Sequence, residues 1–157
     1  MATLEQCIYS FATPITSSED HGKDADGSTI RTEIKIYVGD KFWICVGSFE
    51  NNTPIPPNTL REMDMSFITA DWKSIDFDKI TKIQSTIFYF HPSLTGGDDY
   101  WDMRRELVLK FTEDKFITIG GPTIVERLHI INDQQVIKNN FIRSDFSYVR
   151  RMKPPIG

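Results

Sequence analysis

The chain has 157 residues and a mass of 18.1 kDa, the size of one domain. Apolar residues make up 39% of it, and together with the glycines they reach the lower end of the globular range, which excludes a disordered or collagen-like chain. The apolar stretches are far shorter than the roughly 18 residues of a membrane-spanning helix. We therefore expect a soluble protein that does not enter a membrane.

The charge is that of an acidic protein, with 18 basic and 22 acidic residues and a net charge of −4. Proteins that bind nucleic acid usually carry a basic excess, because their cations neutralise phosphates. Nucleic acid is therefore an unfavoured partner for this chain.

Residues 1–157 are expected to form a single domain with an exposed loop at residues 13–28, which are mostly polar, and a mobile basic tail at residues 150–157. The first residues show no basic segment followed by an apolar one, so we expect no secretion signal and a cytoplasmic location. Cys7 and Cys45 both fall in strand-like segments without metal-ligand spacing. Two reduced, packed thiols are expected from them.

Strand periodicity dominates the chain. Residues 30–38 alternate between apolar and polar side chains, and Gly39 and Asp40 separate them from the β-rich residues 42–46. Alternation followed by a short loop of turn-forming residues predicts a β-hairpin. A first strand is expected at residues 7–12.

Two further hairpins are predicted in the second half of the chain. Residues 106–111 lead through four turn residues into residues 116–119, and residues 123–131 and 136–143 flank the turn formers at 132–135. Residues 83–90 carry bulky side chains on both faces, as expected for a strand near the centre of a sheet.

The segment at residues 59–82 is ambiguous. Leu60, Met63 and Phe67 fit one helical face, and residues 74–82 allow two helical turns, but Met63, Met65 and Phe67 also fit a strand. The prolines in residues 50–58 exclude a helix there. The predicted fold is mainly β, with antiparallel sheets forming a sandwich or half-open barrel and with room for one or two short helices; the alternative is an α+β fold.

The buried core is expected to include apolar residues from five of these strands. They are Ile34, Ile36, Ile44, Val46, Phe88, Leu107, Leu109 and Ile119.

One cluster of residues is a candidate functional site. It combines three carboxylates with two aromatic side chains: Asp98, Asp99, Tyr100, Trp101 and Asp102. A loop of this composition can attract a cationic partner and then bury aromatic surface against it. With His91 nearby, Asp98, Asp99 and Asp102 also form the one candidate for acid–base catalysis.

The sequence favours a binding protein over an enzyme. No spacing typical of a nucleotide, metal or serine-nucleophile site is found, so we expect no catalytic residue, no cofactor and no metal. Our first hypothesis is a small acidic protein that binds and neutralises another protein, such as a bacterial toxin-immunity protein acting on a cationic toxin domain. The alternatives are a small enzyme that uses the His91 cluster, or a carbohydrate- or lipid-binding β-sandwich.

Overall fold

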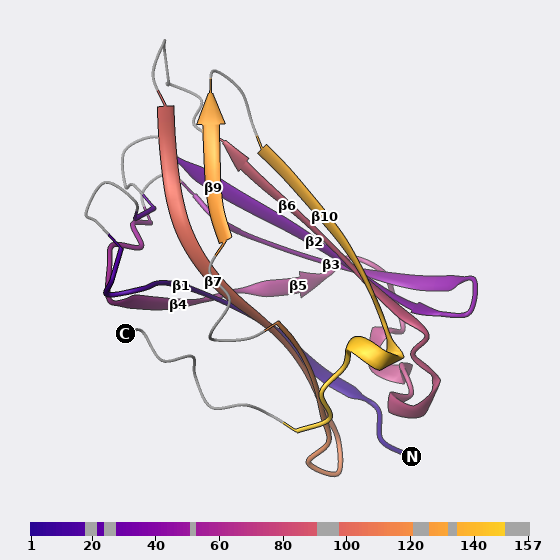
Figure 1. Cartoon of the computed structure of the whole chain (residues 1–157). Coiled ribbons are helices and arrows are strands. Elements are labelled where there is room, and N and C mark those ends of the chain that lie inside the picture. The colour runs from indigo at the N-terminus through magenta and orange to yellow at the C-terminus, as the bar shows by residue number, and fades with distance from the viewer. Residues whose placement is uncertain are drawn as a thin grey trace.

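The computed structural model describes residues 1–17, 22–23, 28–50, 53–90, 98–120, 126–131 and 135–149. The chain folds into two five-stranded antiparallel sheets that face each other across a common core (Figure 1). The first sheet has the order β4-β1-β7-β8, with β9 also paired to β7, and the second has the order β10-β6-β2-β3-β5. This confirms the predicted mainly β, sandwich-like fold, and the sheets do not close into a barrel.

The chain passes several times between the two sheets. The first sheet contains β1 (Leu4–Thr13), β4 (Thr59–Met63), β7 (Asp98–Phe111), β8 (Phe116–Gly120) and β9 (Glu126–Ile131). The second contains β2 (Thr29–Val38), β3 (Lys41–Phe49), β5 (Met65–Phe67), β6 (Lys82–Phe90) and β10 (Gln135–Ile142). Short 3-10 turns are present at η2 (Trp72–Ser74), η3 (Phe77–Lys79) and η4 (Arg143–Asp145).

Two of the predicted hairpins are confirmed. Strands β2 and β3 pair from Ile30 with Phe49 to Val38 with Lys41, and Gly39 in the turn has a φ of 61°. Strands β7 and β8 pair through a turn in which Glu113 and Asp114 have φ values of 62° and 52°. Positive φ values are typical of tight hairpin turns because they match the twist of the flanking strands.

The third predicted hairpin is wrong in its pairing. Strand β9 pairs with the first half of β7, and β10 pairs with β6 in the other sheet. Leu128 of β9 lies opposite Trp101, whereas Ile137 of β10 lies opposite Ile87. Turn-forming residues permit a tight connection but do not specify it, and here each strand pairs with a different apolar neighbour.

The segment at residues 59–82, for which the sequence left helix and strand open, forms strands β4 and β5 followed by the 3-10 turns η2 and η3. Met63 of β4 lies opposite Tyr9 in the first sheet, whereas Met65 of β5 lies opposite Gly47 in the second. The chain therefore crosses between the sheets at Asp64. Three apolar residues on a helical face could not match the burial that these two strand pairings provide.

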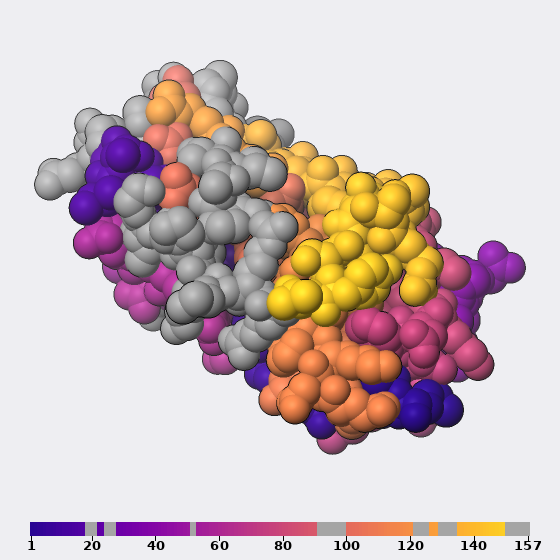
Figure 2. Space-filling model, turned by 60° about the horizontal axis from the view of Figure 1, so that its bottom comes forward, coloured from indigo at the N-terminus to yellow at the C-terminus, as the bar shows by residue number. Residues whose placement is uncertain are grey.

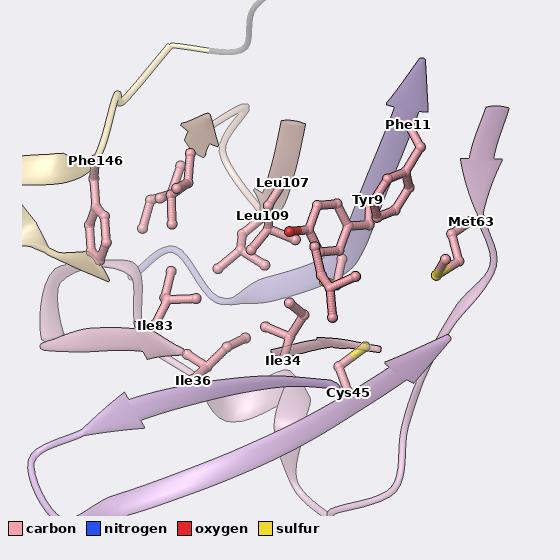
Figure 3. Packing of buried hydrophobic residues seen from close by; sticks show 14 of the residues in the cluster. Tyr9, Phe11, Ile34, Ile36, Cys45, Met63, Ile83, Leu107, Leu109 and Phe146 are labelled. Carbon is pink, nitrogen blue, oxygen red and sulfur yellow. The ribbon is translucent and has the colours of Figure 1, made fainter. Parts of the chain in front are cut away.

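The core lies between the sheets and is built from the inward side chains of both (Figure 3). Ile34, Ile36, Leu107, Leu109 and Ile119 are buried as predicted. The prediction was wrong for Ile44, Val46 and Phe88, which are only half-buried.

The error at β3 has a simple cause. Every residue from Phe42 to Val46 is apolar, so alternation could not indicate which face points inward. Trp43, Cys45 and Phe49 are the buried residues of this strand. Cys7 and Cys45 are both buried and free, as predicted.

Part of the loop expected to be exposed is anchored in the interior. Lys23 is 2% exposed, and its main chain bridges that of Ile55. Its ammonium group donates hydrogen bonds to the carbonyls of Ser28 at 3.1 Å, Glu50 at 3.2 Å and Thr53 at 2.5 Å. These bonds offset the cost of burying a charge, which composition alone did not reveal. The predicted tail at residues 150–157 lies outside the described residues.

Candidate binding surface

The predicted site at residues 98–102 lies in a strand and not in a loop. These residues form the first part of β7 and pair with β9 from Asp98 with Ile131 to Asp102 with Arg127. The side chains of Asp98 and Asp99 lie outside the description, as does His91. Their predicted roles in catalysis or partner binding therefore stay predictions.

Trp101 belongs to the core. Its side chain is 0% exposed, and its ring centroid lies 5.7 Å from that of Tyr89 and 6.1 Å from that of Phe11. Its indole N–H donates a hydrogen bond to Thr13 Oγ1 at 2.7 Å. A fully buried and hydrogen-bonded indole contributes to the fold, and it does not present a surface for a partner.

Asp102 is also in the interior, with 7% of its surface exposed. Its carboxylate accepts hydrogen bonds from Arg127 Nε at 2.7 Å and Nη2 at 3.1 Å. The hydrogen bond that Arg127 donates to Asp102 raises the pKa of Arg127, whose guanidinium lies 5.8 Å from the ring centroid of Tyr100. The structure thus brings Tyr100, Asp102 and Arg127 together as a cross-strand cluster between β7 and β9, without an exposed aromatic anchor.

A second polar cluster, centred on Arg105, connects the two sheets. The guanidinium of Arg105 binds both carboxylate oxygens of Glu126, at 2.8 Å and 2.9 Å. It also donates to Asn139 Oδ1 at 2.7 Å and to the Tyr9 hydroxyl at 3.2 Å. The Tyr9 and Ser85 hydroxyls are hydrogen-bonded at 2.9 Å.

Burial raises the pKa of the Tyr9 hydroxyl above its usual value of 10, and the nearby charge of Arg105 partly offsets this. The residues of the cluster come from β1, β6, β7, β9 and β10, so it links strands that are distant in sequence. Because such a cluster exists only after the sheets meet, no sequence spacing indicated it. Its satisfied hydrogen bonds suit it to fixing the relative position of the sheets.

A groove lies on the outer face of the second sheet, which is the face turned away from the core. It has a volume of about 550 Å³. The described residues that line it are Arg31, Thr32, Glu33, Val46, Gly47, Ser48, Phe88 and Phe90. Val46 lies opposite Glu33, and Phe88 lies opposite Arg31, so the groove spans β3, β2 and β6.

The same outer face carries exposed apolar side chains beyond the groove. Val136, directly opposite Phe88 on β10, is 47% exposed, and Ile142 at the other end of β10 is 55% exposed. Phe42 is 39% exposed, and Ile68, whose N–H donates to the Ile44 carbonyl, is 66% exposed. Of these residues Val136 adjoins the groove, so the apolar part of this face is centred on the groove, and apolar surface gathered at one place marks an interaction site more often than scattered residues do.

The charges on this outer face are mainly positive, although the whole protein is acidic. On the five described strands, Lys35, Lys82 and Lys138 share the face with Arg31, and Glu33 is the carboxylate among them.

Several of these cations lie over aromatic rings. Lys82 Nζ is 4.2 Å from the Tyr37 ring centroid and Lys35 Nζ is 5.1 Å from that of Phe42. Arg31 lies 5.3 Å from the Phe90 centroid and 3.7 Å from Glu50. These contacts hold basic and apolar groups side by side.

Sequence alternation in residues 30–38 already placed Arg31, Glu33, Lys35 and Tyr37 on one face. It did not indicate that Val46 and Phe88 join them, because both were assigned to the core. The sequence of β6 did indicate the direction of Phe88. Lys82, Gln84 and Phe88 are separated by even numbers of residues, so Phe88 lies on the same face of the strand as these two polar residues.

Among the described residues, no three His, Cys, Asp or Glu side chains are grouped so that they could hold a metal ion. No helix there has the length and apolar character needed to cross a membrane.

Comparisons with protein-family models, with curated proteins and with solved structures found no match for this chain.

Proposed function

We propose that the protein acts by binding another protein on the outer face of the second sheet, and that it neutralises this partner by covering its surface, as a toxin-immunity protein does. The observation that supports this most directly is the groove between Val46 and Phe88, together with the exposed apolar residues beside it. Recognition sites commonly combine an apolar centre with a polar rim. Here the polar residues Arg31 and Ser48 line the groove beside Phe88.

The chemistry of the face favours a partner that is apolar and locally acidic. Arg31 pairs with Glu50 at 3.7 Å and Lys35 with Glu33 at 3.8 Å within the chain. Lys82 and Lys138 add further positive charge to this face, which carboxylates on the partner would complement. The cationic toxin domain expected from residues 98–102 fits this face less well. We move the proposed contact because Trp101 and Asp102 lie in the interior.

Site-specific photo-crosslinking tests the proposal in the native host. A photoreactive amino acid at Ser48, which is exposed beside the groove, is expected to attach one partner protein. The matched control has the same amino acid at Glu5, exposed on β1 of the first sheet. Attachment of the same partner with equal yield from both positions would contradict the proposed location.

The purified partner then allows a quantitative test. Phe88→Glu is expected to weaken its binding by about 30-fold or more, as loss of a central apolar contact does. Glu5→Gln, which also changes the charge by one unit but on the other sheet, should leave binding within about twofold of the parent, because exposed residues outside an interface contribute little.

Neutralisation adds a further expectation, namely that one equivalent of the protein abolishes the partner's activity. If an oligosaccharide or a lipid occupies the groove and Phe88→Glu abolishes that binding instead, the protein-binding proposal is wrong and the sugar- or lipid-binding alternative takes its place.

A further inference from the structure

Strand β10 lies at one edge of the second sheet and, among the described strands, pairs with β6 alone. Its eight residues make it longer than the edge strands β4 and β8, with five residues each, and β5, with three. The part of the chain that contains β10 lies at the surface of the molecule (Figure 2). The unpaired side of such an edge strand can accept another strand.

The direction of the free backbone groups follows from one hydrogen bond. The N–H of Ile142 donates to the Asp145 carboxylate at 2.9 Å, so it points away from β6. In an antiparallel pair, alternate residues direct their N–H and C=O groups to the same side. Val136, Lys138 and Asn140 therefore face the open edge, and Asp145 closes that edge at Ile142.

The polarity of β10 is nearly the same when it is read from either end. From residue 136 to residue 142 the strand has two apolar residues, three polar ones and two apolar ones: Val136, Ile137, Lys138, Asn139, Asn140, Phe141 and Ile142. We propose that a second copy of this chain adds its own β10 to this edge, antiparallel and centred on Asn139, so that one continuous sheet spans a dimer. Apolar residues then lie opposite apolar residues, and polar opposite polar.

The register follows from the position of the lysine. Centred on Asn139, the pairing places Lys138 opposite Asn140 of the partner subunit and Val136 opposite Ile142 of the partner subunit. Because the Ile142 N–H stays bonded to Asp145, this outermost pair is joined only through the Ile142 C=O. A pairing centred on Lys138 would place two lysines opposite each other, and one centred on Asn140 would place Lys138 opposite an isoleucine. Like charges directly opposite each other destabilise a strand pair, so the Asn139 register is favoured.

This dimer would extend the outer face. Val136 lies opposite Phe88 of the groove, so Ile142 of the partner subunit would lie next to the groove as well. The inference stands independently of the protein proposed to bind there, because it depends only on the edge of β10.

Sedimentation equilibrium of the full chain tests the dimer with two substitutions at one exposed position. Asn140→Asp places a carboxylate opposite each Lys138 and is expected to lower the dimer dissociation constant about three- to ten-fold. Asn140→Lys places a second cation there and should raise the constant by a similar factor. Both effects should shrink in high salt.

A third substitution separates the edge from the monomer fold. Asn140→Pro removes an outward N–H, which an edge strand tolerates, and should abolish the dimer while the β circular dichroism signal is retained.

A wild-type chain that stays monomeric at its highest soluble concentration would overturn the proposal. Equal dissociation constants for Asn140→Asp and Asn140→Lys would overturn the register, and binding of a foreign extended peptide in place of a second copy would overturn the assigned occupant.

Discussion

The two faces of the second sheet carry similar residues in different surroundings. On β6, Ile87 is 0% exposed between the sheets, whereas its neighbour Phe88 points outward and is half-buried. On β3, Cys45 and Val46 show the same contrast. One face is apolar because the fold needs a core, but the fold does not require apolar residues on the other. The comparison indicates that stability and recognition are assigned to opposite faces of the same strands.

The largest difference between the faces should be in stability. Leu109→Ala removes a core side chain that is 0% exposed, and we expect the free energy of unfolding to fall by about 2–5 kcal/mol. Val46→Ala on the outer face should cost less than about 1 kcal/mol, since its side chain loses little packing. Urea unfolding of both variants measures the contrast, and equal losses would show that the outer face is part of the core.

The Arg105 cluster tests whether the core face also depends on polar contacts. Arg105→Met leaves Glu126 and Tyr9 without their cation, and we expect a loss of about 3 kcal/mol in unfolding free energy. Adding Glu126→Met should recover part of that loss, because an apolar pair can replace an ion pair. A double variant as unstable as the sum of the single ones would argue against an interaction between the two residues.

Tyr9 gives the core face a pH dependence. Its raised pKa means that the folded state keeps the hydroxyl neutral at pH values where the unfolded chain, with a pKa near 10, has lost the proton. The stabilising contribution is therefore complete below pH 10 and is lost as the pH rises through the higher folded pKa. Above pH 10 the unfolding free energy of the parent should fall more steeply than that of Tyr9→Phe. Parallel curves would contradict the assignment.

Local patterns predicted most of the strands but not their long-range partners. Alternation and Gly39-Asp40 were sufficient for the β2–β3 hairpin, because both signals lie within the hairpin itself. Strand β10 belongs to the second sheet because it pairs with β6, which lies 45 or more residues earlier in the chain. Asp98 and Asp99 follow two glycines, which suggested a turn. However, Trp101, Met103, Leu107 and Leu109 are spaced by even numbers of residues, as on one face of a strand, and all of them belong to β7.

The candidate surface was the least predictable feature for a related reason. Phe88 and Val46 are as apolar as core residues, and only the position of the other sheet shows that they face outward. Trp101 and Asp102, which the sequence predicted in the binding site, instead lie where β7 pairs with β9, opposite Leu128 and Arg127. The apolar character of a residue therefore predicted in general that it is buried, but it did not predict whether its side chain faces the core or the outer face of the sheet.

Thiol chemistry distinguishes the faces with little effect on stability. A hydrogen bond with Cys45, followed by burial, raises the pKa of the Cys7 thiol. Both natural thiols should therefore react with a thiol-specific dye only as fast as the protein unfolds. Val46→Cys places a thiol on the outer face one residue from Cys45, and one additional equivalent should react much faster. A fast reaction of the natural thiols would contradict the described core.

The account depends most on Phe88, and one pair of measurements on Phe88→Ala tests it directly. We expect the unfolding free energy to fall by no more than about 1 kcal/mol, as for a cross-strand contact on an open face. We expect the affinity for the purified partner to fall about 30-fold or more, as for a central contact residue. A variant that loses several kcal/mol of stability while its folded fraction binds the partner as tightly as the parent would show that Phe88 supports the fold and that the outer face is not the binding surface.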